Sequence, residues 1–227
     1  MGMFIFSINY HSNPKKPVLP LGAKLNYYNQ TTLPYDSIDC SKISNIDGMR
    51  YFFMESSYQT IPPLLSTSDK LIWADCFKNC INLITAPDMD TSGGYAFADM
   101  FNGCSHLVTI PRLNISGNSG TPENLYRIFQ GCTRLETIGW ESDIKASLNM
   151  EDCSALSDAT ILATCYALYD GAGQTLTLNT ALSAKGAQNI KLNATADGLE
   201  FCDAADPETI GTLNDYVTAK SWTLQFS

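Results

Sequence analysis

The residues in this chain that could do the most varied chemistry are its eight cysteines, which could form disulfides, bind a metal or act as nucleophiles. A structural zinc site needs ligands two to four residues apart, usually in two such pairs. Only Cys76 and Cys80 lie that close, and residues four apart on a helix pack together just as readily. The spacing therefore predicts no metal site, and the chain carries no cofactor motif.

Catalysis by a serine or cysteine nucleophile needs a base, and the two histidines are His11 and His106. Neither belongs to a nucleophile motif such as G-x-S-x-G, and there is no phosphate loop or dinucleotide fingerprint. The carboxylates of Asp88 and Asp90 would share one face of a strand, which could suit a glycan hydrolase. A polar binding surface or a solvated face explains the same pair, and we expect a protein that is not an enzyme.

Four of the cysteines occupy the same slot of a repeated segment. Each copy has an aromatic or apolar residue, a cysteine three residues later and a leucine three residues after that. The copies are Phe77-Lys-Asn-Cys80-Ile-Asn-Leu83, Phe101-Asn-Gly-Cys104-Ser-His-Leu107, Phe129-Gln-Gly-Cys132-Thr-Arg-Leu135 and Met150-Glu-Asp-Cys153-Ser-Ala-Leu156. A fifth copy upstream keeps the frame through Phe52, Tyr58, Ile61 and Pro62, with Glu55 in the cysteine slot. The copies begin at residues 52, 77, 101, 129 and 150, and these periods of 21 to 28 residues lie in the range of leucine-rich repeats.

Each repeat unit combines two periodicities. The aromatic residue, cysteine and leucine at intervals of three predict a helical turn, and the alternation after Ile110 predicts a short strand. Neither element could bury its apolar face alone, so the units must stack and share one core. Stacking places Cys80, Cys104, Cys132 and Cys153 in one column, where we expect buried, reduced thiols that pack as small apolar side chains.

The repeat resembles that of the BspA-like leucine-rich-repeat family, whose units have phenylalanine, cysteine and leucine at this spacing, then isoleucine-proline and a short strand. The resemblance covers residues 36–156, and Glu55, Tyr58, Gly139 and Met150 depart from the family pattern. It implies an α/β fold, a leucine-rich-repeat solenoid of about five short helix-strand units. Members of the family are surface and virion proteins with varied ligands.

The two ends lack the repeat and are expected to cap the solenoid. Residues 1–35 join an apolar run to Pro14, Pro17 and Pro20, and this segment either attaches the protein to another chain or forms the N-terminal cap. The apolar run makes a poor secretory signal, because no basic residue precedes it. Residues 157–227 predict a C-terminal helix-strand cap continuous with the solenoid, with helices at 158–169, 181–190 and 207–220 and strands at 175–178 and 222–226.

Composition limits the partners. The 14 lysines and arginines are scattered and the net charge is −9, so the chain lacks the clustered basic residues that bind nucleic acid. No run reaches the roughly 18 apolar residues of a membrane span. The absence of a disulfide pattern fits folding in a reducing cytosol, which is where phage proteins fold.

The strand of each unit has an outward face that could bind a ligand. If Met89 and Leu113 point inward, alternation puts their neighbours on one exposed patch. The patch residues are Asp88, Asp90, Arg112 and Asn114, with Trp140 near the same position of the next unit. Such a surface suits a glycan or a partner protein. The alternative is that Trp140 packs into its own unit, where Gly139 replaces the proline.

These observations predict a non-catalytic interaction protein. The leading expectation is a virion-associated component, in a fibre, in a tail or attached to the capsid. Its repeat face would bind a host surface protein or glycan, its N-terminal segment would bind other virion proteins, and it could form a homo-oligomer. One alternative is a bacterial cell-surface adhesin whose export signal lies outside this sequence, and another is a glycan hydrolase.

Overall fold

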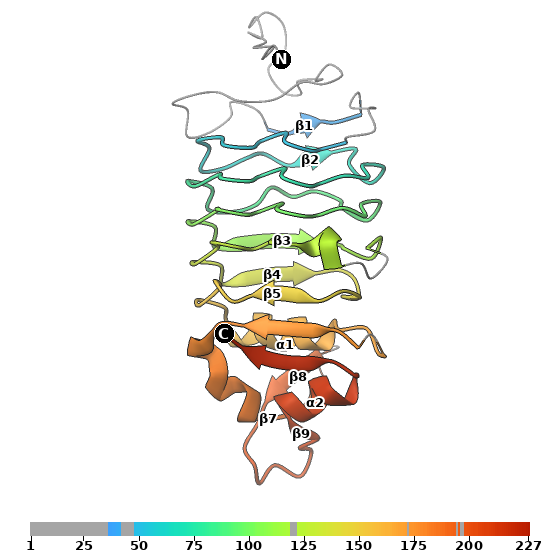
Figure 1. Ribbon diagram of the computed structural model, residues 1–227, viewed down its shortest axis with the longest axis vertical. Helices are drawn as coiled ribbons and strands as arrows, with labels where there is room; N and C mark the ends of the chain where they lie inside the picture. Colours follow the sequence, from blue (N-terminus) through green and yellow to red (C-terminus); the bar gives the residue numbers. More distant parts are fainter. Residues whose placement is uncertain (1–35, 42–47, 119–121, 172, 194, 196–197) are drawn as a thin grey trace, which may run out of the picture.

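A computed structural model describes residues 36–41, 48–118, 122–171, 173–193, 195 and 198–227. They form an elongated stack in which successive turns of the chain lie one above another, with the longer helices and strands at one end (Figure 1). We call each turn of the chain a rung and number rungs 1 to 4 by Phe53, Phe77, Phe101 and Phe129. The expected attachment segment, 1–35, lies outside the described residues.

One side of each rung consists of two consecutive tight turns. In rung 2 the Cys76 N–H donates to the Trp73 carbonyl over 3.1 Å and the Cys80 N–H to the Phe77 carbonyl over 3.0 Å. The third residue of each turn has a positive φ, 57° at Asp75 and 58° at Asn79. The equivalent positive-φ pairs are Tyr51 and Glu55, Asp99 and Gly103, and Arg127 and Gly131.

These turns replace the helical stretch expected in each unit. A residue with positive φ cannot continue a right-handed helix, so every rung leaves the helical path twice. Among the described residues the first α-helix is α1, Asp158–Tyr166, which lies after the repeats. The expectation of a short helix in each unit was therefore wrong, and the three-residue spacing corresponds to turns.

Hydrogen bonds between rungs link the turns into a ladder. The Asp75 N–H donates to the Ala98 carbonyl over 3.0 Å, and the Phe77 N–H donates to the Met100 carbonyl over 2.9 Å. Rungs 1 and 3 make the same bonds to the rungs that follow them. Because the backbone polar groups of one rung are satisfied by the next, a single rung could not be stable alone.

The opposite side of the rungs is made of short parallel strands. Strand β1, Ile38–Asp39, pairs with β2, Leu64–Leu65, and β3, Thr109–Leu113, pairs with β4, Thr137–Trp140. Isolated parallel bridges join Thr60 to Thr85 and Thr85 to Thr109. A short 3-10 helix, η1, Pro122–Leu125, precedes rung 4.

A column of aromatic rings fills the interior between the two sides. The rings of Phe53, Phe77 and Phe101 are stacked nearly parallel, with centroids 5.4 Å and 5.2 Å apart, and Phe129 follows at 6.2 Å. The column shows that Phe53, and not Phe52 as expected, occupies the phenylalanine slot of rung 1, because the Phe53 ring stacks on Phe77. Ser56, not Glu55, then occupies the cysteine slot, and it is buried. Tyr58 of rung 1 corresponds to Leu83 of rung 2, but rung 1 has one residue fewer between Phe53 and Tyr58 than rung 2 has between Phe77 and Leu83. Counting back from Tyr58 and Ile61 therefore placed the phenylalanine slot one residue too early, at Phe52.

The cysteine column lies beside the phenylalanines and is fully buried, as expected. Each thiol reaches the carbonyl of the phenylalanine in the preceding rung. The distances from Sγ to the carbonyl oxygen are 3.0 Å for Cys80, 3.0 Å for Cys104, 3.2 Å for Cys132 and 3.8 Å for Cys153. Burial raises the pKa of the Cys132 thiol to about 12. The slot is therefore buried and hydrogen-bonded, not purely apolar.

The C-terminal elements continue the stack through a parallel sheet of three strands. Its order is β10-β6-β5, from Thr223–Phe226, Thr175–Leu178 and Leu148–Met150. Helix α1 begins where expected, with the Ser157 hydroxyl accepting from the Thr160 N–H over 3.2 Å.

The remaining C-terminal elements differ in part from the expectations. The segment expected as a helix at 181–190 is the 3-10 helix η2, Thr180–Ala187, followed by β7, Asn189–Asn193. Strand β7 pairs antiparallel with β8, Gly198–Phe201, and with β9, Gly211–Thr212. Helix α2, Leu213–Ala219, covers only part of the expected 207–220. Pairing between β7 and its neighbours overrides the local helical preference.

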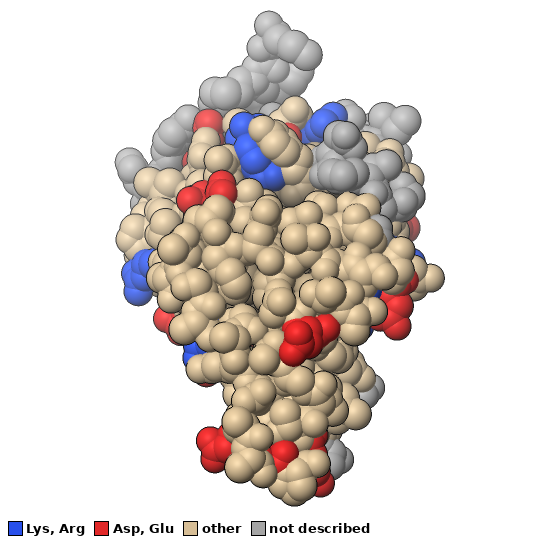
Figure 2. Space-filling model, turned by 60° about the horizontal axis from the view of Figure 1, so that its bottom comes forward, with Lys and Arg blue, Asp and Glu red and all other residues tan. Residues whose placement is uncertain are grey.

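The surface agrees with a chain of low charge content. On the face that Figure 2 shows, most of the surface is uncharged and the lysines and arginines lie apart. None of the described helices is both long and apolar enough to cross a membrane.

Candidate functional site

An ion-pair row crosses the outward face of the strand side. The Arg112 guanidinium lies 3.6 Å from an Asp88 carboxylate oxygen in rung 2. It also donates to Glu141 in rung 4, with Nη2 3.1 Å from Oε2, and its Nε lies 3.1 Å from Oε1. Because one cation is shared by two carboxylates, the row carries a net negative charge. The Arg112 and Glu141 side chains are 38% and 37% exposed, so a ligand could reach them.

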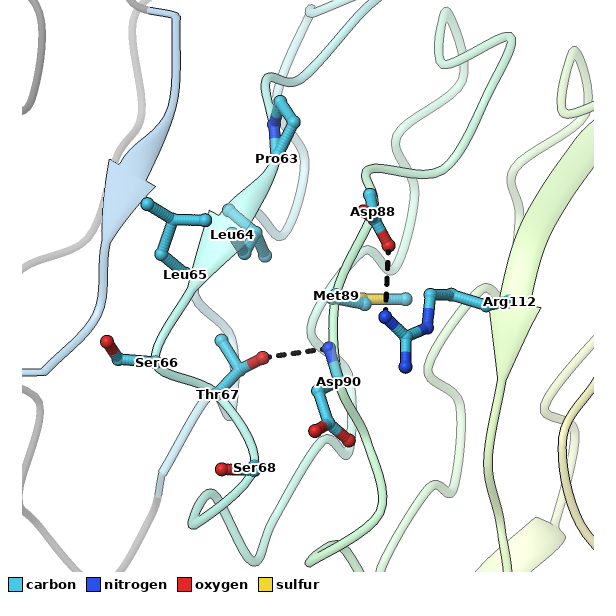
Figure 3. A pocket seen from close by; sticks show the side chains of 10 residues that line it. All are labelled: Pro63, Leu64, Leu65, Ser66, Thr67, Ser68, Asp88, Met89, Asp90 and Arg112. Carbon is cyan, nitrogen blue, oxygen red and sulfur yellow. Dashed lines mark hydrogen bonds and ion pairs between the residues drawn. The ribbon is translucent and has the colours of Figure 1, made fainter.

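An open depression of about 230 Å³ lies at the end of this row. Residues 63–68 of rung 1 line one side, and Asp88, Met89, Asp90 and Arg112 line the other (Figure 3). The Asp90 N–H donates to the Thr67 hydroxyl over 2.9 Å, which joins the two sides at the base. The structure thus brings together three of the five predicted site residues: Asp88, Asp90 and Arg112.

The side chains of Asp90 and Asn114 stabilise turns as well as facing outward. An Asp90 carboxylate oxygen accepts the Ser92 N–H over 2.9 Å, and the Asn114 amide oxygen accepts the Ser116 N–H over 3.0 Å. Each side chain therefore fixes the turn that follows its strand. Asn114 does not line the depression.

The protonation state of Asp90 bears on the hydrolase alternative. Hydrogen bonds from Ser92, with a smaller contribution from the Arg112 charge, hold the pKa of Asp90 below its usual range. A glycosidase needs one carboxyl group with a raised pKa to protonate the leaving group. Asp90 is thus unsuited to that role.

Trp140 is not on the outward face. Its indole N–H donates to the Thr164 hydroxyl of α1 over 2.9 Å, and its ring packs edge-on against Phe129 with centroids 6.2 Å apart. In the β3–β4 pair Trp140 lies opposite Leu113, whose side chain is buried. The expectation that Trp140 belongs to the exposed patch was therefore wrong, and the packing alternative describes it.

The reason is a shift of register between β3 and β4. Ile110 pairs with Ile138, and Leu113 pairs with Trp140. Two residues separate the paired positions in β3, but only one residue separates them in β4. A shift of one residue moves the following side chains to the opposite face. Glu141 therefore takes the outward place beside Arg112. Sequence reasoning missed Glu141, although the loss of the proline at Gly139 marked the change. A Cβ at Gly139 would lie 2.1 Å from the Pro111 carbonyl oxygen, so the two strands approach too closely there for any other residue.

His106 has a structural contact. Its Nδ1 lies 2.7 Å from the carbonyl oxygen of Ile81, and the ring is exposed. The imidazole therefore bridges two rungs at the surface. His11 lies outside the described residues.

Comparisons of the chain with protein-family models, with curated proteins and with solved structures give no match.

Proposed function

We propose that the rungs form a leucine-rich-repeat solenoid of the BspA-like kind and that the protein is a non-catalytic interaction protein. Its ligand is a host surface glycan or protein, bound at the depression beside Asp88, Arg112 and Glu141. The observation that carries the proposal is the coincidence of this depression with the shared ion-pair row on the outward face.

The chemistry of the depression suits a polar, extended ligand. Ser66 and Ser68 supply exposed hydroxyl groups, and Asp88 and Arg112 supply an exposed acceptor and donor. Hydroxyl-rich ligands such as sugars, and polar side chains of a protein, are bound by such sets of donors and acceptors. The depression is small and open, so it would hold one part of a ligand that continues along the stack.

The proposed location is a virion, with the segment 1–35 contacting other virion proteins. All eight cysteines are free thiols, and seven of them are buried. Free thiols fit a chain that folds in a reducing cytosol, where phage particles assemble. Mass spectrometry of purified virions tests this location, and recovery of the protein only in bacterial membrane fractions would contradict it.

Replacement of Arg112 tests the binding face. Arg112→Ala removes the guanidinium that two carboxylates share, leaving the face more negative. We expect binding to host cells, followed by flow cytometry with the labelled full chain, to fall at least about tenfold. Arg134→Ala is the matched control, because Arg134 is exposed in rung 4 away from the depression. Unchanged binding by Arg112→Ala, with unchanged circular dichroism, would contradict the assigned face.

A further inference from the structure

The outer surface of the turn side changes shape after rung 4. Rung 4 makes two tight turns, with positive φ of 53° at Arg127 and 75° at Gly131. The equivalent stretch of the next turn of the chain is strand β5, which belongs to the parallel sheet β10-β6-β5. A groove of about 290 Å³ lies where the turns of rung 4 meet the outer face of this sheet. The groove shares no lining residue with the depression beside Arg112, so this inference does not rest on the proposed function.

A polar row across the three strands forms the floor of the groove. Asn149 pairs with Thr177, and Thr177 pairs with Gln225, so the three side chains stand in register. The flanking Leu176 and Leu178 are fully buried, and alternation along the strand therefore directs Thr177 outward. The Gln225 Nε2 donates to the Thr177 hydroxyl over 2.9 Å. Because sheet pairing and this bond fix the row, the floor is formed before any ligand binds.

Two amide side chains of the lining have a donor to spare. The Gln130 Oε1 accepts the Asn102 amide over 3.2 Å, and the Gln130 side chain is exposed. The Asn149 Oδ1 accepts the Glu151 N–H over 2.9 Å. Neither amide nitrogen, Gln130 Nε2 or Asn149 Nδ2, has a hydrogen-bond partner among the residues that the structure describes. Each amide is thus held by its oxygen and leaves its nitrogen to donate to a ligand.

Two carboxylates of the lining have an acceptor to spare. One Asp152 oxygen accepts the Gly131 N–H over 2.8 Å, and one Glu151 oxygen accepts the Ser227 hydroxyl over 3.0 Å. Within the part of the chain that the structure describes, the second oxygen of each carboxylate makes no hydrogen bond or ion pair. The groove therefore offers a mixed set of positioned donors and acceptors.

Tyr126 forms an aromatic wall on the side of rung 4. Its side chain is 58% exposed, and the Arg127 guanidinium lies 4.5 Å from its ring centroid. Arg127 also pairs with Asp99 over 2.8 Å, so its charge is balanced within the protein. The charges of Glu151 and Asp152 are not balanced in this way, and the groove is therefore negative.

We propose that this groove binds a neutral oligosaccharide. A sugar hydroxyl both donates and accepts, so it satisfies the spare amide nitrogens and carboxylate oxygens together. The exposed Tyr126 ring packs against the apolar face of a sugar ring. The carboxylates repel sialylated and sulfated saccharides. A lysine or arginine side chain of a basic peptide has no acceptor, so it would leave the Gln130 and Asn149 amide nitrogens unpaired.

A glycan array tests the chemistry of the ligand. The labelled full chain is applied to an array that carries neutral oligosaccharides beside their sialylated and sulfated forms. We expect neutral glycans to bind, and the anionic form of the same glycan to bind at least about tenfold more weakly. The proposal is overturned if no glycan binds or if the anionic forms bind as well as the neutral ones. Binding of hexalysine in place of any glycan would assign a basic peptide and overturn it too.

Isothermal titration calorimetry with a glycan bound on the array locates the site. Tyr126→Ala removes the aromatic wall, and Tyr95→Ala is the matched control, because Tyr95 is 43% exposed and does not line the groove. We expect the Kd to rise at least about fivefold in Tyr126→Ala and to stay unchanged in Tyr95→Ala. An unchanged Kd in Tyr126→Ala would remove the glycan from this groove.

A second pair of variants tests the floor independently of rung 4. Asn149→Trp fills the groove from β5, whereas Thr223→Trp adds the same ring to β10 at an exposed position that does not line the groove. Binding should be lost in Asn149→Trp and kept in Thr223→Trp, with circular dichroism showing that both fold. Full binding by Asn149→Trp would contradict the proposal. Loss of glycan binding in Arg112→Ala, with binding kept in Asn149→Trp, would place the glycan at the depression instead.

Discussion

Replacing Cys104 by serine or alanine tests what the repeated cysteine contributes. The thiol is fully buried, and its Sγ lies 3.0 Å from the Phe77 carbonyl oxygen. Alanine loses this hydrogen bond and leaves a void of about one methylene group. The transfer contribution is about 0.8 kcal/mol and the weak hydrogen bond adds about 0.5 to 1, so Cys104→Ala should lower the free energy of unfolding by about 1.3 to 1.8 kcal/mol.

Serine should be the better replacement at this site. Its hydroxyl can still donate to the Phe77 carbonyl, and Ser56 already occupies the same slot in rung 1. The smaller oxygen fills less space, so we expect Cys104→Ser to cost about 0.5 to 1 kcal/mol. This is the reverse of the order for a purely apolar slot, where a buried hydroxyl costs more than a methyl group.

Urea unfolding followed by circular dichroism measures both values. With a slope near 2 kcal/mol/M, Cys104→Ala should lower the midpoint by about 0.6 to 0.9 M and Cys104→Ser by about half as much. Cys202→Ala is the control, since Cys202 lies outside the column and is only partly buried. An alanine variant more stable than the serine variant would show that the thiol acts only as an apolar group, and the hydrogen-bond reasoning would fail.

The other predictions concern the thiols, Trp140 and the N-terminal segment. Thiol titration of the native protein should label Cys202 quickly and the buried thiols only after denaturation, and fast labelling of all eight would contradict the assigned burial. Because burial raises the pKa of Cys132 to about 12, its contribution to stability is complete below pH about 9 and is lost as the pH rises towards 12. The loss of stability between pH 9 and 12 should accordingly be smaller in Cys132→Ala than in the parent protein. The same pH dependence in both proteins would show that ionisation of Cys132 does not cause the loss. Trp140→Ala should lower the free energy of unfolding by about 3 kcal/mol, since it loses the packing on Phe129 and the bond to Thr164, and a fully stable variant would refute the packing role. Deletion of residues 1–33 should leave a folded body that no longer joins its assembly, whereas unfolding would identify the segment as a cap.

The repeat pattern in the amino-acid sequence is enough to predict a stack of units and the side chains that fill its interior. Phenylalanine, cysteine and leucine recur at fixed intervals, and residues at one slot of a repeat must meet when the units stack. The cysteine column, the start of α1 after Ser157 and the strand at 175–178 could all be predicted for this reason. Three of the five site residues also come together as predicted, because inward Met89 and Leu113 force their neighbours outward.

The local geometry of each rung and the register of its strands depend on contacts between distant segments. Spacings of three fit a helix and a pair of turns equally well, and only the positive φ values at Asp75 and Asn79, held by hydrogen bonds to the next rung, choose between them. Trp140 packs inward and Glu141 takes the outward place because β4 has one residue fewer than β3 between paired positions, which a single strand does not reveal. A repeat fixes which residues stack, but pairing between distant segments fixes which of them face solvent.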